Sequence, residues 1–115
     1  MHPSLAFQKA KRAQRRQKLE QELDRMLPLL KAWGVHKVIL FKLRMTSDRD
    51  LLVVMETSKR FLDRLDELYC LLDPKIALDL LVYTPDEFYR LRETNPLVRR
   101  AIAEGRVLYA AKSES

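Results

Sequence analysis

The sequence of 115 residues is poor in cysteine, in glycine and in long apolar runs. Its one cysteine, Cys70, excludes an internal disulfide and favours a reducing compartment. Two glycines leave little room for flexible linkers, so we expect a single domain. The longest apolar run, 76–82, is interrupted by Asp79 and is far too short to span a bilayer, and no apolar segment typical of a signal peptide follows the N-terminus. We therefore expect a cytoplasmic protein that does not enter a membrane.

Negative charge is missing from the first eighteen residues. Removing the six basic residues found there from the total of 22 leaves 16 basic residues against 16 acidic ones, so the net charge of +6 belongs to this segment. We predict a basic, helical arm over 1–18, a domain over 19–111 and a frayed tail over 112–115. The arm could bind nucleic acid or an acidic partner, or could be a solvated helix face. No aromatic residue interleaves with the charges to stack on bases. The basic residues are Lys9, Lys11, Arg12, Arg15, Arg16 and Lys18.

Hydrophobic periodicity predicts alternating helices and strands. A leucine stripe at spacings of three and four predicts a long first helix, with a kink or break near Asp24–Pro28 because proline removes a helical hydrogen bond. Ser58 and Thr84 are the expected N-caps of two later helices, the second with Pro85 and Glu87 in a capping box. We expect a mixed α/β (α+β) fold, a mixed β-sheet with flanking helices. The expected helices cover about 4–33, 58–72, 85–94 and 96–104, and the strands 35–41, 50–55, 76–83 and 106–110.

Three aspartates stand where the predicted strands could bring them together. Asp48 and Asp50 are two residues apart at the start of the second strand, so their side chains point to the same side. Asp79 interrupts the next strand, where a buried carboxylate is costly unless it is paired or binds a metal ion. Adjacent carboxylates repel one another unless a cation lies between them, and Mg²⁺ or Mn²⁺ prefers such oxygen ligands. The pattern favours a metal-dependent phosphoryl-transfer site.

Each aspartate also has an ordinary structural interpretation. Asp48 could be a turn residue, and Asp50 a charged strand end. Asp79 could pair with Lys75 or Arg106. A shared site for all three carboxylates is the sharper hypothesis, because an acidic pair before one apolar strand and a single acid inside the next is an uncommon combination.

The segments Val38–Phe41, Ser47–Val53 and Leu78–Phe88 resemble the minimal nucleotidyltransferases of the DNA polymerase β-like superfamily. The pattern Ser-Asp-x-Asp-Leu-Leu-Val carries most of the resemblance, and the ending Asn95–Tyr109 is similar as well. The resemblance implies the nucleotidyltransferase fold and transfer of a nucleoside monophosphate from a nucleoside triphosphate to an acceptor. It assigns the metal ions and catalysis to Asp48, Asp50 and Asp79. The residues that could hold the nucleotide are Lys42, Arg44, Ser47 and Arg49.

The chain departs from this family after Phe41, where Lys42-Leu43 replaces the Gly-Ser that holds phosphates. Leucine offers neither the close backbone approach of glycine nor a hydroxyl group, so we expect weakened or absent catalysis. The alternative is an inactive interaction module of the same fold. Family members are often encoded beside a helical HEPN partner and some act as antitoxins, so the resemblance implies a HEPN-type partner; self-association into a homo-oligomer is a further expectation.

Overall fold

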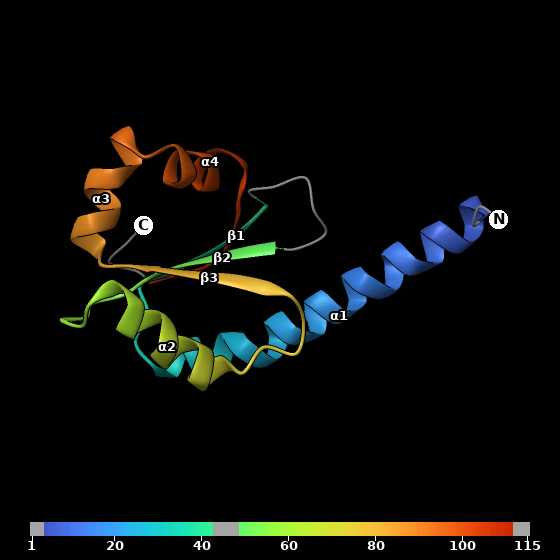
Figure 1. The fold of residues 1–115 in the computed structure, drawn as a ribbon, viewed down its shortest axis with the longest axis horizontal. Coiled ribbons are helices and arrows are strands. Elements are labelled where there is room, and N and C mark those ends of the chain that lie inside the picture. Colours follow the sequence, from blue (N-terminus) through green and yellow to red (C-terminus); the bar gives the residue numbers. More distant parts are fainter. Residues whose placement is uncertain (1–3, 43–48, 112–115) are drawn as a thin grey trace.

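The computed structural model describes residues 4–42 and 49–111 as four helices and four strands (Figure 1). The expected mixed α+β class is confirmed. In chain order the elements are α1 (Leu5–Ala32), β1 (Lys37–Phe41), β2 (Arg49–Val54), α2 (Phe61–Leu72), β3 (Leu78–Tyr83), α3 (Pro85–Thr94), α4 (Pro96–Glu104) and β4 (Arg106–Ala110).

The four strands form one mixed sheet in the order β3-β2-β1-β4. β1 pairs antiparallel with both β2 and β4, whereas β2 and β3 are parallel. Parallel strands need a crossover connection, and α2 supplies it. β1 and β2 are almost entirely buried, which suits central strands covered on both faces.

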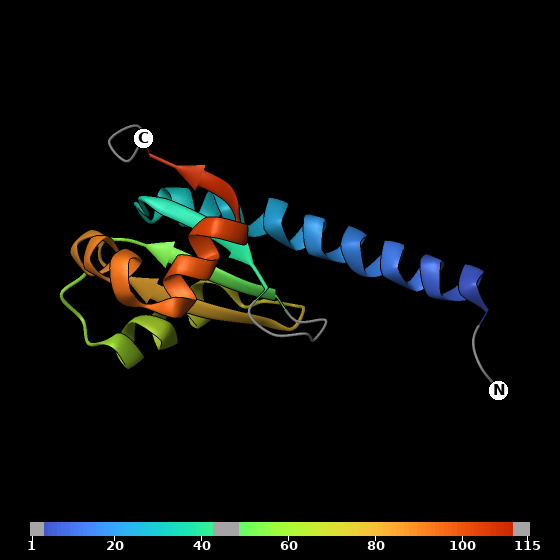
Figure 2. The ribbon, with the colours of Figure 1, turned by 90° about the horizontal axis from the view of Figure 1, so that it is seen from above.

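Helices cover both faces of the sheet (Figures 1 and 2). α1 and α2 pack on one face, in a core that includes Met26, Leu30 and Leu68. On the other face, Val98 and Ala101 of α4 pack against Ile39, with partly buried residues of α3 beside them. Along β1, β2 and β3, alternate residues contribute to the two cores, because successive side chains point to opposite faces. The face on which a residue of these three strands lies therefore follows from its number.

α1 is much longer than the part of it that packs on the sheet. Its C-terminal half buries Leu23, Met26 and Leu30, whereas every residue from Ser4 to Lys18 is exposed. The exposed half projects away from the sheet (Figure 2), which accounts for the elongated shape of 52 × 29 × 27 Å. Of the kink or break predicted near Asp24–Pro28, the break is wrong, since α1 continues through Pro28. Asp24 and Pro28 are both exposed, so water can satisfy the carbonyl group that proline leaves without a donor.

α3 and α4 begin at the residues that the sequence predicts, whereas α2 does not. The capping box of Thr84 and Glu87 before α3 is confirmed, as are the helix starts at Pro85 and Pro96. α2 begins at Phe61 rather than after Ser58, and its N-cap residue Arg60 makes no side-chain cap. The predicted strands 35–41 and 76–83 both begin two residues later than expected, and the expected strand 50–55 runs from Arg49 to Val54. None of the helices described is long and apolar enough to cross a membrane.

Candidate functional site

Two of the three aspartates lie side by side at one end of the sheet. Asp50 of β2 is the register partner of Asp79 of β3, and on its other side it faces Phe41 of β1. Neighbouring strands are about 5 Å apart, so the two carboxyl groups start from adjacent backbone positions. Asp50 shares its face with Leu52 and Asp79 with Leu81, which places both acids on the face covered by α3 and α4.

The two carboxylates differ in their exposure to solvent. Asp50 is buried, with 8% of its surface exposed, whereas Asp79 is exposed. The expectation that Asp79 would be a buried acid is therefore wrong, because it lies near the open end of β3, an edge strand. The pairings suggested for it are wrong as well. Lys75 contacts Asp73 and Arg106 contacts Glu20, and Asp79 makes no ion pair with any other described residue.

A like-charged pair in register across two strands is unfavourable by itself. The repulsion falls when a cation lies between the carboxylates, and their oxygen atoms are the donors that Mg²⁺ and Mn²⁺ prefer. Asp50 and Asp79 therefore fit a divalent cation by position and by chemistry. Two acids are fewer than a closed protein site needs: within 4–42 and 49–111 no three His, Cys, Asp or Glu side chains form a metal-binding group. The third predicted ligand, Asp48, lies outside the described residues.

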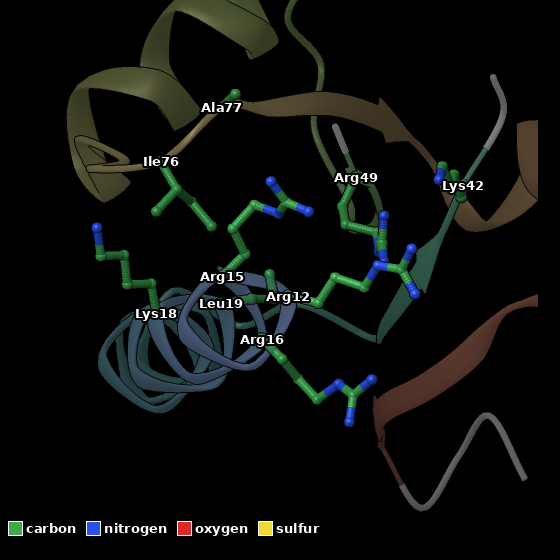
Figure 3. Close-up of a pocket in the computed structure, with 9 residues that line it drawn as sticks. All are labelled: Arg12, Arg15, Arg16, Lys18, Leu19, Lys42, Arg49, Ile76 and Ala77. Carbon is green, nitrogen blue, oxygen red and sulfur yellow. The ribbon is translucent and has the colours of Figure 1, made fainter. Parts of the chain in front are cut away.

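The predicted nucleotide-binding residues are not on the face of the acids. Lys42 and Arg49 line a pocket of about 410 Å³ on the face covered by α1 (Figure 3). Arg49 and Asp50 are consecutive residues of one strand, so their side chains point to opposite faces. Arg44 and Ser47 lie outside the described residues. Lys42 and Arg49 therefore lie on the opposite face of the sheet from Asp50 and Asp79, and their part in nucleotide binding stays a prediction.

The pocket joins the projecting half of α1 to the sheet. We name it the α1 pocket. Arg12 and Arg15 reach from α1 toward Arg49 in Figure 3, while Arg16 and Lys18 point away from them. The apolar part of the wall comes from α1 and from the segment before β3. The full lining is Arg12, Arg15, Arg16, Lys18, Leu19, Lys42, Arg49, Ile76 and Ala77.

Sequence analysis missed that the basic arm takes part in this pocket, because it separated the arm from the domain at residue 18. The sequence does contain a pattern that indicates this contact. Arg12 and Arg15 continue, at helical spacing, the stripe of Leu19, Leu23 and Met26 that packs on the sheet. Side chains on that stripe lie on the side of α1 that faces the sheet, so they can contact the rest of the domain.

An ion-pair network fixes α1 beside the pocket. The buried Glu22 accepts hydrogen bonds from Nε and Nη2 of Arg25, at 2.8 and 3.0 Å, and from the backbone amide of Lys75, at 2.8 Å. Arg25 also donates to the carbonyl oxygens of Leu72 and Asp73, at 2.7 and 3.2 Å. The network ties α1 to the segment between α2 and β3. The same segment supplies two apolar residues of the pocket wall.

These contacts also set the charge of Glu22. The hydrogen bonds from Arg25 lower the pKa of Glu22 from 4.5 to about 2, the Lys75 amide contributes in the same direction, and partial burial opposes both. Glu22 is therefore ionised across the physiological range, and α1 is held in place by a charged group.

The side chains of α2 are less buried than its leucine content suggests. Cys70 on this helix is exposed. On the same helix Leu68 and Leu72 are buried, whereas Leu62 is 71% exposed. α2 therefore buries a narrower stripe than its leucine content suggests.

Comparison with protein-family models, with curated proteins and with solved structures finds no match for this chain.

Proposed function

We propose that the chain is a minimal nucleotidyltransferase-type protein that binds a nucleoside triphosphate through a divalent cation at Asp50 and Asp79, with weakened or absent catalysis. The observation that carries the proposal is the register pairing of these two acids on one face of parallel strands. The proposed reaction is the transfer of a nucleoside monophosphate to an acceptor hydroxyl group, with pyrophosphate as the leaving group.

Sequence context supports the same assignment. Asp48 precedes Asp50 by two residues, the spacing of the resemblance described above, and is the proposed third ligand. A bound Mg²⁺ or Mn²⁺ would neutralise the phosphate oxygens of the nucleotide. The chain itself contributes Asp50, held in place by burial, and Asp79, whose exposure leaves its carboxylate accessible to an acceptor group.

Weak catalysis is expected because the chain lacks the usual residues that hold the phosphates. A preorganised cradle of backbone amides is the usual means of holding a triphosphate, and Lys42-Leu43 replaces the Gly-Ser sequence that would build it. Lys42 and Arg49 line the pocket on the opposite face of the sheet, away from the two acids.

The test is calorimetric titration of ATP with Mg²⁺ into the protein and into an Asp50→Asn/Asp79→Asn variant. We expect binding that requires Mg²⁺ and is lost in the variant. Asp63→Asn/Asp66→Asn is the matched control: it makes the same charge change on the exposed surface of α2 and should bind as the native protein does. The absence of binding at millimolar ATP, or equal binding by both variants, would overturn the proposal.

A second candidate is an interaction module that keeps the fold without the activity. The observation that favours it is the position of β4 at the edge of the sheet, with Val107 55% exposed. An edge strand offers unpaired backbone groups to another chain. The proposed occupants are a second copy of the protein or a helical HEPN-type partner. Light scattering after gel filtration tests the first case: a Val107→Lys variant should convert an oligomer into monomers, and a native monomer would exclude self-association.

A further inference from the structure

We propose that the α1 pocket and the exposed half of α1 together bind the phosphate backbone of a nucleic-acid duplex. This site is distinct from the proposed nucleotide site, because the sheet separates the α1 pocket from Asp50 and Asp79.

The charges on the exposed half of α1 do not stabilise it as an isolated helix. The first turn contains no acidic residue that would complement the helix dipole. Like charges stand three and four residues apart, as in Arg12 with Arg15 and Arg12 with Arg16, and such pairs destabilise a helix. Arg12, Arg15, Arg16 and Lys18 make no ion pair with any other described residue. A solvated face selected only for solubility would mix both signs, whereas a bound polyanion would remove every one of these penalties.

The cations form a continuous track rather than a scattered surface. Arg12 and Arg15 line the α1 pocket and also a smaller neighbouring pocket formed by Phe7, Gln8 and Lys11 of the same helix. The track continues across to Lys42 at the end of β1. The exposed residues 5–18 of α1 extend over about 21 Å at 1.5 Å per residue. A single nucleotide would cover only part of this length, whereas a strand with regularly repeated phosphates can contact all of it.

The side chains suit phosphate rather than other anions or bases. Arginine forks bind phosphate oxygens in pairs, and three of the pocket's cations on α1 are arginines. The apolar wall of the α1 pocket consists of Leu19, Ile76 and Ala77, which offer no ring on which an unpaired base could stack, and the Phe7 ring of the neighbouring pocket has the Lys11 ammonium group over it at 5.0 Å. This favours the backbone of a duplex over a single strand. A membrane surface is a poorer fit, because an interfacial helix needs a wide apolar face and the apolar residues after Phe7 in the exposed half are alanines.

The experiment measures binding of a fluorescein-labelled 16-base-pair duplex by fluorescence anisotropy between 50 and 200 mM salt. The test variant is Arg12→Gln/Arg15→Gln, and the control is Arg90→Gln/Arg99→Gln on α3 and α4, which removes the same two charges from the opposite side of the sheet. Glutamine is a good helix former, so α1 should remain helical, and circular dichroism checks this.

We expect the test variant to bind at least ten times more weakly at 100 mM salt, and its slope of log affinity against log salt to be smaller by about two, one for each lost phosphate contact. The control should stay within threefold of the native protein. The Asp50→Asn/Asp79→Asn variant should keep duplex binding, so failure here and failure of the nucleotide site are distinguishable.

Four results would overturn the proposal. These are no duplex binding at 50 mM salt, equal weakening in the test and control variants, stronger binding of the single strand than of the duplex, and full competition by polyglutamate or by vesicles of anionic lipid at equal charge. The last result would assign the track to an acidic protein or to a membrane surface instead.

Discussion

The replacement Glu22→Gln tests whether a charged, buried contact fixes α1 to the domain. Glutamine keeps the size of the side chain but replaces the carboxylate with a neutral amide. That carboxylate accepts two hydrogen bonds from Arg25 and one from the Lys75 amide. Breaking one partner of a buried ion pair costs about 3–5 kcal/mol, and the 38% exposure of the Arg25 side chain reduces this by screening. We expect the free energy of unfolding at pH 7 to fall by about 2 kcal/mol.

The pH dependence of this loss gives an independent check. The folded-state pKa of Glu22, about 2, lies below the value of 4.5 expected in the unfolded chain. The stabilisation is therefore complete above about pH 5 and is lost as the pH falls toward 2. The difference between the native protein and Glu22→Gln should shrink by more than half between pH 7 and pH 3.

Urea denaturation followed by circular dichroism at pH 7, 5, 4 and 3 measures both quantities. The matched control is Glu20→Gln on the same helix: Glu20 pairs with Arg106 at 2.8 Å, and the side chains of Glu20 and Arg106 are 43% and 60% exposed. Exposed pairs contribute less than about 1 kcal/mol. Equal losses for the two variants, or a loss for Glu22→Gln that does not change with pH, would refute the argument that the buried charge holds α1.

Three further predictions concern the rest of the fold. Gly105→Ala should destabilise the protein by about 2 kcal/mol or more in urea denaturation, because an added Cβ would lie 2.2 Å from the Ala101 carbonyl oxygen and 2.5 Å from Cγ2 of Ile39; unchanged stability would contradict the close packing of α4 on β1. Thr84→Ala should cost about 1 kcal/mol in the same assay through loss of the capping box, and a neutral result would mean that Glu87 alone caps α3. Cys70 should react with a thiol reagent in the folded protein as fast as in urea, whereas protection would place it in the core.

The order of the elements could be predicted from the sequence because each element carries its own local signal. Thr84-Pro85 and Asn95-Pro96 define helix starts through side-chain caps and the fixed φ of proline, and both starts are confirmed. Strand pairing depends on contacts far apart in the sequence, although a short connection suits the antiparallel β1–β2 pair and the helical connection through α2 suits the parallel β2–β3 pair.

The candidate site was only partly predictable. The adjacency of Asp50 and Asp79 followed from strand order, but the exposure of Asp79 depends on β3 being an edge strand, which no local pattern reveals. The position of Arg49 follows from strand alternation and was missed because Arg49 was assigned to the turn rather than to β2. The α1 pocket also requires the angle at which α1 leaves the sheet, a result of packing rather than of helix propensity.

The alternation of Arg49 and Asp50 makes the electrostatics of both faces depend on the register of one strand. The next four residues of β2 are Leu51, Leu52, Val53 and Val54, all buried, so a slip by one position would exchange apolar side chains of similar size between the two cores. The same slip would turn a cation toward the acidic face and a carboxylate toward the basic one. Hydrophobic burial therefore discriminates poorly between the two registers, and the charges alone would favour the slipped one, because each would then meet charges of the opposite sign. The native register keeps like charges together on each face, an arrangement that the two proposed ligands, a cation on one face and a polyanion on the other, would stabilise.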